Sequence, residues 1–253
     1  MTRQRIVFPG QWRPHYPWEQ IAWLRPPWTT RDSVWLDFPE AIFCDAGLLF
    51  LSHVNPRFPQ RFPDLPRVPW TVRSDVISYR RDLPNGVAFG GSVAQRDEYR
   101  VAIELFMENG GEEPLRDIRL QTCLFLRACK EFGAYTGANK RVHVPGRWVT
   151  LEEAIRRGEE ADDRPGATYR VGWRRGALVA DQPWVVTLSD EAERLVAMSC
   201  RRSTFSIVGN PEHPCMHADP FFEDIEPGAT ATVAGEIVFF DGGLAAFEDA
   251  VMG

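Results

Sequence analysis

Alternation of apolar and polar side chains over residues 99–108 is the feature that most restricts the fold of this chain. The apolar members on one face are Val101, Ile103, Leu105 and Met107. A period of two is typical of a half-buried antiparallel strand. Asn109-Gly110-Gly111 is a turn signal, and we expect residues 115–128 to form the partner strand of a hairpin.

Similar short segments recur along the chain between turn signals. Further strands are expected at 35–38, 41–44, 47–53, 75–81, 87–95, 168–174, 183–189, 194–201, 204–209 and 230–240. Only two helices are expected, one after a capping box at Thr150–Glu153 and one at 244–252. The pattern predicts a mainly β protein, a large antiparallel β-sandwich with two short helices, rather than a βαβ fold.

The 253 residues are expected to form a single domain. Residues 1–35 are rich in tryptophan and proline, which excludes a regular helix or a central strand there. We expect this segment to be an extended arm packed on the sandwich. A hydrophobic content of 44% is that of a globular protein whose core needs no disulfide or metal.

Charge and cysteine content exclude several classes of function. The net charge of −6 argues against a nucleic-acid partner, which requires a basic surface. The five cysteines are an odd number and contain no CxxC pair, so they predict neither a disulfide framework nor a zinc ribbon. Without a signal-like segment or an apolar run near 18 residues, we expect a bacterial cytoplasmic protein with no membrane partner.

Chemistry-bearing side chains are concentrated in the run from Asn210 to Pro220. His213, Cys215, His217 and Asp219 stand at every second position between prolines. In an extended strand they would share a face at steps of about 6–7 Å, so His213 and His217 are candidate ligands of a divalent metal. Ligands on one flat strand converge poorly on a single ion. We therefore favour a rigid rim that presents His217 and Asp219 to a pocket and requires no cofactor.

Three other segments are candidates for binding or catalysis. His53 ends an apolar strand, where a histidine is well placed for acid–base work. The N-terminal arm offers a sugar-stacking wall with polar edges, formed by Trp12, His15, Trp18 and Glu19. Two basic segments suit a carboxylate-bearing ligand, through Lys140, His143, Trp173 and Arg174. For each segment, a purely structural role is the alternative.

Two stretches carry a family resemblance. VAIELFMENGGEEPLRDIRLQTCLFL (101–126) and DIEPGATATVAGEIVFF (224–240) resemble the central hairpin and last strand of galactose-mutarotase-like supersandwich domains. The resemblance implies a concave sheet face that holds a sugar. Aldose epimerases of that class use a histidine acid and a glutamate base, which implies His217 or His53 as acid and Glu236 as base. The chain also resembles uncharacterised bacterial proteins that carry HPCMHADP.

These observations favour a carbohydrate-active enzyme of the epimerase, lyase or hydrolase type, with histidine acid–base catalysis on a sugar or sugar acid. A metal-dependent enzyme that uses His213 and His217 is one alternative. A non-catalytic sugar-binding protein is another, in which the tryptophans form a binding platform or the interface of a homo-oligomer.

Overall fold

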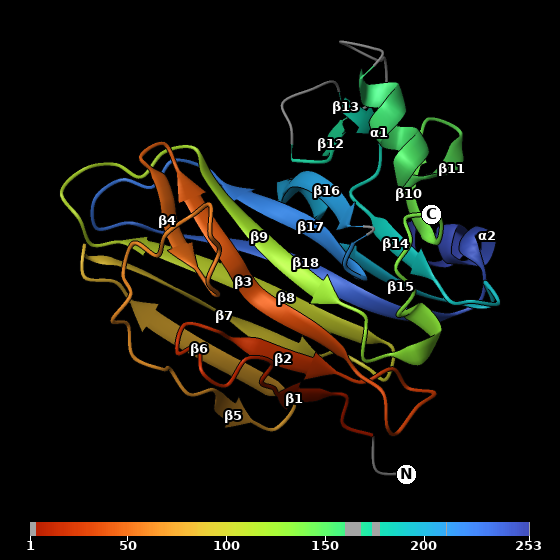
Figure 1. Ribbon diagram of the computed structural model, residues 1–253, viewed down its shortest axis with the longest axis horizontal. Coiled ribbons are helices and arrows are strands. Elements are labelled where there is room, and N and C mark those ends of the chain that lie inside the picture. Colours follow the sequence, from red (N-terminus) through yellow and green to blue (C-terminus); the bar gives the residue numbers. More distant parts are fainter. Residues whose placement is uncertain (1–3, 160–167, 174–177, 211, 253) are drawn as a thin grey trace.

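Two β-sheets stacked face to face make up the fold of the computed structural model (Figure 1), which describes residues 4–159, 168–173, 178–210 and 212–252. The first sheet has the order β1-β2-β3-β9-β17-β16-β12-β13, with β4 paired to β3. The second has the order β11-β10-β14-β15-β18-β8-β7-β6-β5. Neighbouring strands are antiparallel except β12 and β16, which are parallel. The expected antiparallel sandwich is confirmed.

The first sheet consists of β1 (Val7–Pro9), β2 (Ile21–Leu24), β3 (Val34–Cys44), β4 (Gly47–Leu51), β9 (Ile118–Phe125), β12 (Tyr169–Val171), β13 (Leu178–Ala180), β16 (Thr204–Asn210) and β17 (Cys215–Phe222). The second consists of β5 (Thr71–Arg73), β6 (Val76–Asp82), β7 (Val87–Gln95), β8 (Arg100–Asn109), β10 (Lys140–Val144), β11 (Arg147–Thr150), β14 (Val185–Leu188), β15 (Arg194–Ser199) and β18 (Thr230–Asp241).

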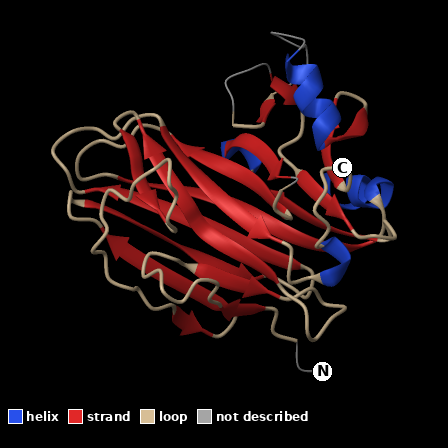
Figure 2. Cartoon of the chain, in the orientation of Figure 1, coloured by secondary structure: helices blue, strands red, loops and turns tan. Residues whose placement is uncertain are grey.

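Both expected helices form, and they lie together at one end of the sandwich (Figure 2). Helix α1 spans Leu151–Glu159, and its first turn is capped by Thr150, whose Oγ1 accepts the backbone N–H of Glu153 at 3.2 Å. Helix α2 (Leu244–Phe247) continues into a π-helical turn at Glu248–Met252. No helix in the described ranges is long and apolar enough to cross a membrane.

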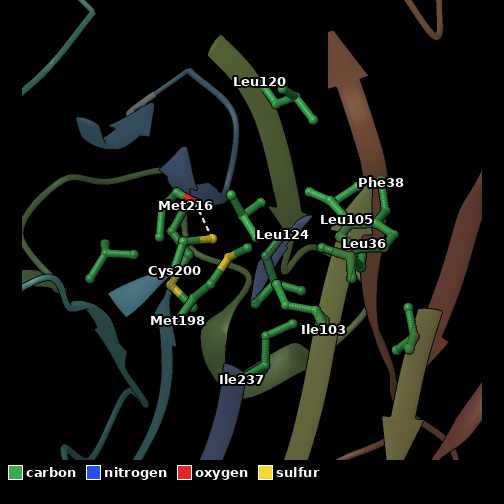
Figure 3. Close-up of a cluster of buried hydrophobic side chains, with 14 of the residues drawn as sticks. Leu36, Phe38, Ile103, Leu105, Leu120, Leu124, Met198, Cys200, Met216 and Ile237 are labelled. Atoms are coloured by element: carbon green, nitrogen blue, oxygen red, sulfur yellow. Dashed lines mark hydrogen bonds between the residues drawn. The ribbon is translucent and has the colours of Figure 1, made fainter. Parts of the chain in front are cut away.

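The hydrophobic core lies between the sheets (Figure 3). Leu36, Phe38, Leu124 and Met216 of the first sheet pack among Ile103, Leu105, Met198 and Ile237 of the second. Because side chains alternate along a strand, the neighbours of these residues point to the outer face of their sheet. In β17 the inward residues Met216 and Ala218 therefore leave Cys215, His217 and Asp219 on the outer face.

The predicted hairpin over residues 99–128 is wrong, although both of its strands form. β8 pairs with β7 and β18 in the second sheet, whereas β9 pairs with β3 and β17 in the first. Asn109 explains the difference, because its Nδ2 donates to the carbonyl oxygens of Glu113 (2.9 Å) and Ile225 (2.8 Å). These bonds direct the glycine-rich segment across the sandwich and not back along β8.

The N-terminal segment is more ordered than an arm. β1 and β2 continue the first sheet beyond β3, with β1 at its edge. Pro9 is the last residue of β1, a position that an edge strand tolerates. Residues 10–20, which we call the N-terminal cover, connect these two strands and pack on the outer face of the first sheet through Trp12.

The proline-framed run is not a rim but leads into a strand in the interior of the first sheet. β17 lies between β9 and β16, and the register with β16 shifts between Thr204 and Ser206, opposite Pro220 and Asp219. That irregularity accommodates Pro220, which has no N–H for the ladder. His213 precedes the strand in a turn and is exposed.

A bulge in β3 determines which of its side chains face outward. Two strands were expected at 35–38 and 41–44, but β3 is continuous and carries two more residues than β9 between the pairs Asp37–Cys123 and Ala41–Gln121. The Phe38–Pro39 peptide within this bulge is cis. The bulge breaks the alternation, so that Asp37 and Glu40 both reach the outer face.

We expect Gly91→Ala to destabilise the fold strongly. A Cβ at this position would lie 2.3 Å from the carbonyl oxygen of Glu104 and 2.6 Å from Cε1 of Phe38, which packs beside the bulge. Overpacking of this kind costs about 1–3 kcal/mol. Thermal and denaturant unfolding would measure the loss against Ser92→Ala on the outer side of the same strand. Equal stability of the two variants would contradict this packing.

Candidate functional site

A pocket of about 530 Å³ opens on the outer face of the first sheet. Its aromatic walls are Phe43, Phe58, Trp173 and Phe205. Its polar lining includes Glu40, His53, Arg119, Gln121 and Asp219. These residues come from β3, the segment after β4, β9, the turn after β12, β16 and β17, so the pocket is assembled from segments far apart in the sequence.

Glu40 lies between two histidines on the floor of this pocket. One carboxylate oxygen, Oε1, is 3.8 Å from Nδ1 of His53, and the other, Oε2, is 3.9 Å from Nδ1 of His217. Nδ1 of His217 is in turn 3.4 Å from Oδ1 of Asp219. Two carboxylates and two imidazoles are therefore close neighbours here, although the distances from Glu40 to either histidine are longer than a hydrogen bond.

Asp219 is fixed by donors from three segments. Its Oδ1 accepts the backbone N–H of Thr122 at 2.9 Å. Its Oδ2 accepts the indole N–H of Trp173 at 2.8 Å and the hydroxyl of Ser206 at 3.4 Å. Because these donors satisfy a carboxylate, Asp219 is held as an acceptor beside His217. The ring of Trp173 also meets that of His217 edge-on, with centroids 5.3 Å apart.

Cys123, Cys215 and His217 form a second, fully buried group that we call the thiol–imidazole cluster. One nitrogen or sulfur atom from each residue lies within 4.8 Å of the others, and Sγ of Cys215 is 3.6 Å from Nε2 of His217. The cluster is covered by Trp12, which stacks on Phe125 with ring centroids 4.4 Å apart.

Within the cluster, the two thiols and the imidazole shift one another's pKa values. The hydrogen bond from Cys123 lowers the pKa of the Cys215 thiol well below its usual value, against the effect of burial, and His217 acts in the same direction. The pKa of Cys123 is raised well above its usual value because of that same hydrogen bond and burial. Burial lowers the pKa of His217, but Asp219 and Cys215 outweigh it and the net shift is upward.

The pKa values of Glu40 and His53, the two pocket groups next to the cluster, shift in opposite directions. Burial raises the pKa of Glu40, although the neighbouring His217 opposes this change. Burial and the charge of Arg13 lower the pKa of His53 from 6.5 to about 4. At neutral pH, His53 is therefore an uncharged imidazole.

A buried ionic network anchors the N-terminal cover to this face. Nη2 of Arg13 is 3.0 Å from Oδ2 of Asp37, which also accepts the hydroxyl of Ser52 at 2.7 Å. Nε of Arg13 is 2.6 Å from Oε1 of Glu19. Burial raises the pKa of Asp37 to about 8, and Arg13 and Ser52 oppose that shift.

The structure brings together four of the residues expected from the sequence. His53, Asp219 and Trp173 line the pocket, and His217 lies directly behind it. Trp12 covers the thiol–imidazole cluster, and Glu19 accepts the backbone N–H groups of Trp12 and Arg13. A role of Trp12 or Glu19 in substrate binding stays a prediction.

Other expected residues lie away from the pocket. His15 is exposed and contacts Tyr16 edge-on, while the indole of Trp18 donates to the carbonyl oxygen of Pro63. Glu236 is in the second sheet and pairs with Arg201 at 3.2 Å. Nothing in their geometry connects these residues with His53 or His217.

Of the basic segments, Lys140 and His143 are also separate from the pocket, which Trp173 lines. Lys140 is fully buried and donates to the carbonyl oxygen of Thr136 at 2.9 Å, and burial lowers its pKa. Nδ1 of His143 is 2.6 Å from Oδ1 of Asp181. Exposed His213 is not a member of the thiol–imidazole cluster, and Arg174 lies outside the described residues.

Sequence reasoning missed Glu40 and Cys123. Glu40 follows a proline inside the bulge, where no alternation indicates its direction. Cys123 is one apolar residue among many in an apolar strand, and it becomes informative only because β9 pairs with β17.

The chain matches no protein-family model and no curated protein. Among solved structures, it is similar to the Slr1438 protein from Synechocystis, at 10% identity and a TM-score of 0.43, over 94% of this chain and 96% of that one. It is also similar to a GalM/aldose epimerase homologue from C. elegans, at 9% identity and a TM-score of 0.43, over 88% of this chain and 96% of that one. A third similar structure is a putative aldose 1-epimerase from Klebsiella pneumoniae, at 9% identity and a TM-score of 0.39, over 85% of this chain and 64% of that one. This weak galactose-mutarotase-like likeness, which the sequence leads us to expect, concerns the fold alone.

We expect His53 to titrate near pH 4 in the folded protein, as measured by NMR of its imidazole resonances. The unfolded state binds this proton near pH 6.5, so His53 removes stability as the pH falls from 6.5 towards 4. His53→Gln should therefore lose less stability than the wild type over that interval. A folded-state pKa near 6.5 and parallel stability curves would contradict the buried environment of His53.

Proposed function

We propose that this chain is a carbohydrate-active enzyme that moves protons on a sugar or sugar acid bound in the outer pocket. The carrying observation is the position of Glu40, which has one oxygen 3.8 Å from His53 in a pocket of about 530 Å³ with aromatic walls. This combination offers both a proton-transfer pair and a surface that suits a sugar ring.

The lining of the pocket supports a carbohydrate as the ligand. The faces of aromatic rings complement the C–H faces of pyranose rings, and Phe43, Trp173 and Phe205 provide such surfaces. A few polar groups then fix the orientation of the sugar. Gln121 and Asp219 can bond to hydroxyl groups, since an amide donates and accepts and a carboxylate accepts.

Arg119 favours a sugar acid within this class. It lines the pocket, and its guanidinium lies over the ring of Phe205 and pairs with Asp117. Its Nε is buried and has no partner among the described residues. A guanidinium with a donor to spare is well suited to a carboxylate.

Proton transfer is assigned to Glu40 and His53. An epimerase or a lyase removes a proton at one position of the substrate and delivers a proton at another, which requires two groups in one pocket. The two groups offered are His53, which is uncharged at neutral pH, and Glu40, whose pKa is raised by burial. Glu40 takes the place that the family resemblance gives to Glu236, which is in the other sheet.

We expect Glu40→Gln and His53→Gln each to lower turnover by about 10²–10⁴-fold, as is usual for a general acid or base. Turnover would be followed by NMR on a panel of aldoses and uronic acids, together with oligosaccharides that contain them. Sugar binding should be largely retained, because glutamine keeps most of the shape of either side chain. Glu108→Gln, at an exposed pair with Arg80, is the matched control.

The same panel separates the enzyme from a non-catalytic sugar-binding protein. If sugars bind but neither the wild type nor any variant turns them over, the proton-transfer role of Glu40 and His53 is wrong. If no member of the panel binds, the assignment of the pocket to carbohydrates is wrong.

Trp173→Ala should weaken sugar binding by about tenfold, in line with the energy of one aromatic contact. Trp173 is half exposed at the wall of the pocket and is held there by its bond to Asp219. Isothermal titration would measure the loss against Tyr135→Ala, which removes a similarly exposed ring elsewhere on the surface. Equal affinities of these two variants would exclude the aromatic wall from binding.

A further inference from the structure

We propose that Cys123, Cys215 and His217 form a binding site for zinc or a related thiophilic divalent ion. This site goes beyond the proposed function, which rests on Glu40 and His53 in the pocket. It also differs from the ligand pair expected from the sequence, because His213 is exposed in the turn before β17.

Distances within the cluster suit a tetrahedral ion. Zinc binds sulfur at about 2.3 Å and imidazole nitrogen at about 2.0–2.1 Å, so two such ligands at a tetrahedral angle lie about 3.6 Å apart. Sγ of Cys215 is 3.6 Å from Nε2 of His217. The atom offered by Cys123 is within 4.8 Å of both.

The three ligands come from two strands, and this allows them to converge on one ion. Ligands spaced along one flat strand converge poorly on an ion, but here Cys123 of β9 faces the two ligands of β17 across the ladder. All three side chains are buried between rigid backbone segments. The ligand set is therefore assembled by the fold and does not depend on a mobile loop.

The chemistry of the donors selects the ion. Two thiolates and one imidazole are soft to intermediate ligands, which favour zinc over magnesium or calcium. Burial of these groups is costly when they are charged and unpaired, and a divalent cation neutralises two thiolates. The same three residues would be a poor site for a hard cation, because they offer no oxygen.

The position of Asp219 beside His217 is an independent indication that His217 is a metal ligand. Nδ1 of His217 is buried and makes no hydrogen bond of good geometry, although Oδ1 of Asp219 is only 3.4 Å away. When Nε2 binds a metal, the proton is fixed on Nδ1, and a carboxylate is the usual partner of that N–H. The donors from Thr122 and Trp173 already hold Asp219 in place for this role.

The test uses the full chain, purified under reducing conditions, loaded with Zn²⁺ or Co²⁺ and dialysed against metal-free buffer. We expect one equivalent of metal per chain by mass spectrometry of the metal content. Co²⁺ should give the intense near-ultraviolet band of cobalt bound to thiolates, together with the visible bands of a tetrahedral site. Zn²⁺ should raise the melting temperature, and a chelator should reverse that rise.

Variants assign the ligands. Cys123→Ser and Cys215→Ser should each weaken Zn²⁺ binding by at least about 100-fold and lose about half of the cobalt–thiolate band. Asp219→Asn should retain the band and weaken binding by about tenfold, as expected for a residue that orients a ligand. Cys44→Ser is the matched control, because Cys44 is also a buried free cysteine but lies outside the cluster.

Two results would overturn the site. The first is a reduced wild-type protein that retains neither Zn²⁺ nor Co²⁺ at equimolar concentration. The second is an unchanged cobalt–thiolate band in Cys123→Ser and Cys215→Ser. If either serine variant fails to fold, Asp219→Asn and the effect of Zn²⁺ on wild-type melting decide the question. None of these measurements requires turnover, so they remain valid if the proposed enzyme activity is wrong.

Discussion

Burial of charged groups on the outer face of the first sheet is the constraint on which the rest of this structure depends. Ionised side chains that leave water must be paired and hydrogen-bonded, or the fold loses several kcal/mol for each of them. Asp219 meets this requirement through Thr122 and Trp173. Asp37 meets it only in part, because Arg13 and Ser52 both bond to its Oδ2 while its buried Oδ1 has no partner among the described residues. Burial accordingly raises the pKa of Asp37 to about 8, so that the carboxyl is largely uncharged at neutral pH. The N-terminal cover supplies Arg13 to that network.

Geometry at two strands determines which groups meet. The bulge in β3 places Asp37 and Glu40 on the same face, although regular alternation would separate positions three apart. The regular alternation of β17 places Cys215, His217 and Asp219 on that face while Met216 fills the core. An irregular strand and a regular one thus converge at Glu40 and His217, with 3.9 Å between carboxylate and imidazole.

Local patterns in the sequence predicted much of the fold because they report local physics. The alternation over 99–108, the capping box at Thr150 and the turn at Pro84-Asn85-Gly86 depend on near neighbours, and each corresponds to a structure of the expected kind. The false hairpin depended instead on where the chain goes after Asn109. That path is decided by a bond to Ile225, more than a hundred residues away.

The site shows the same division between local and distant information. His217 and Asp219 were predictable because their period places both on one face of an extended segment. Glu40 and Cys123 were not, since one depends on a bulge and the other on the pairing of β9 with β17. Lys140 and His143 look like ligand-binding residues in the sequence, but a buried carbonyl and Asp181 take up their polar atoms. Residue type alone does not distinguish a side chain whose polar atoms are bonded within the fold from one whose polar atoms are available to a ligand.

Asp219 connects the pocket with the thiol–imidazole cluster. Its Oδ2 bonds to Trp173 at the wall of the pocket, and its Oδ1 faces Nδ1 of His217 in the thiol–imidazole cluster. Because a carboxylate held by fixed donors cannot turn towards one neighbour without changing its distance to the other, we expect a change at His217 to reach the pocket through Asp219 as well as through Glu40. His53 and Cys123 have no such double contact. A substitution at His53 is therefore expected to change the pocket alone, and one at Cys123 the cluster alone. A substitution at Asp219 is expected to change both.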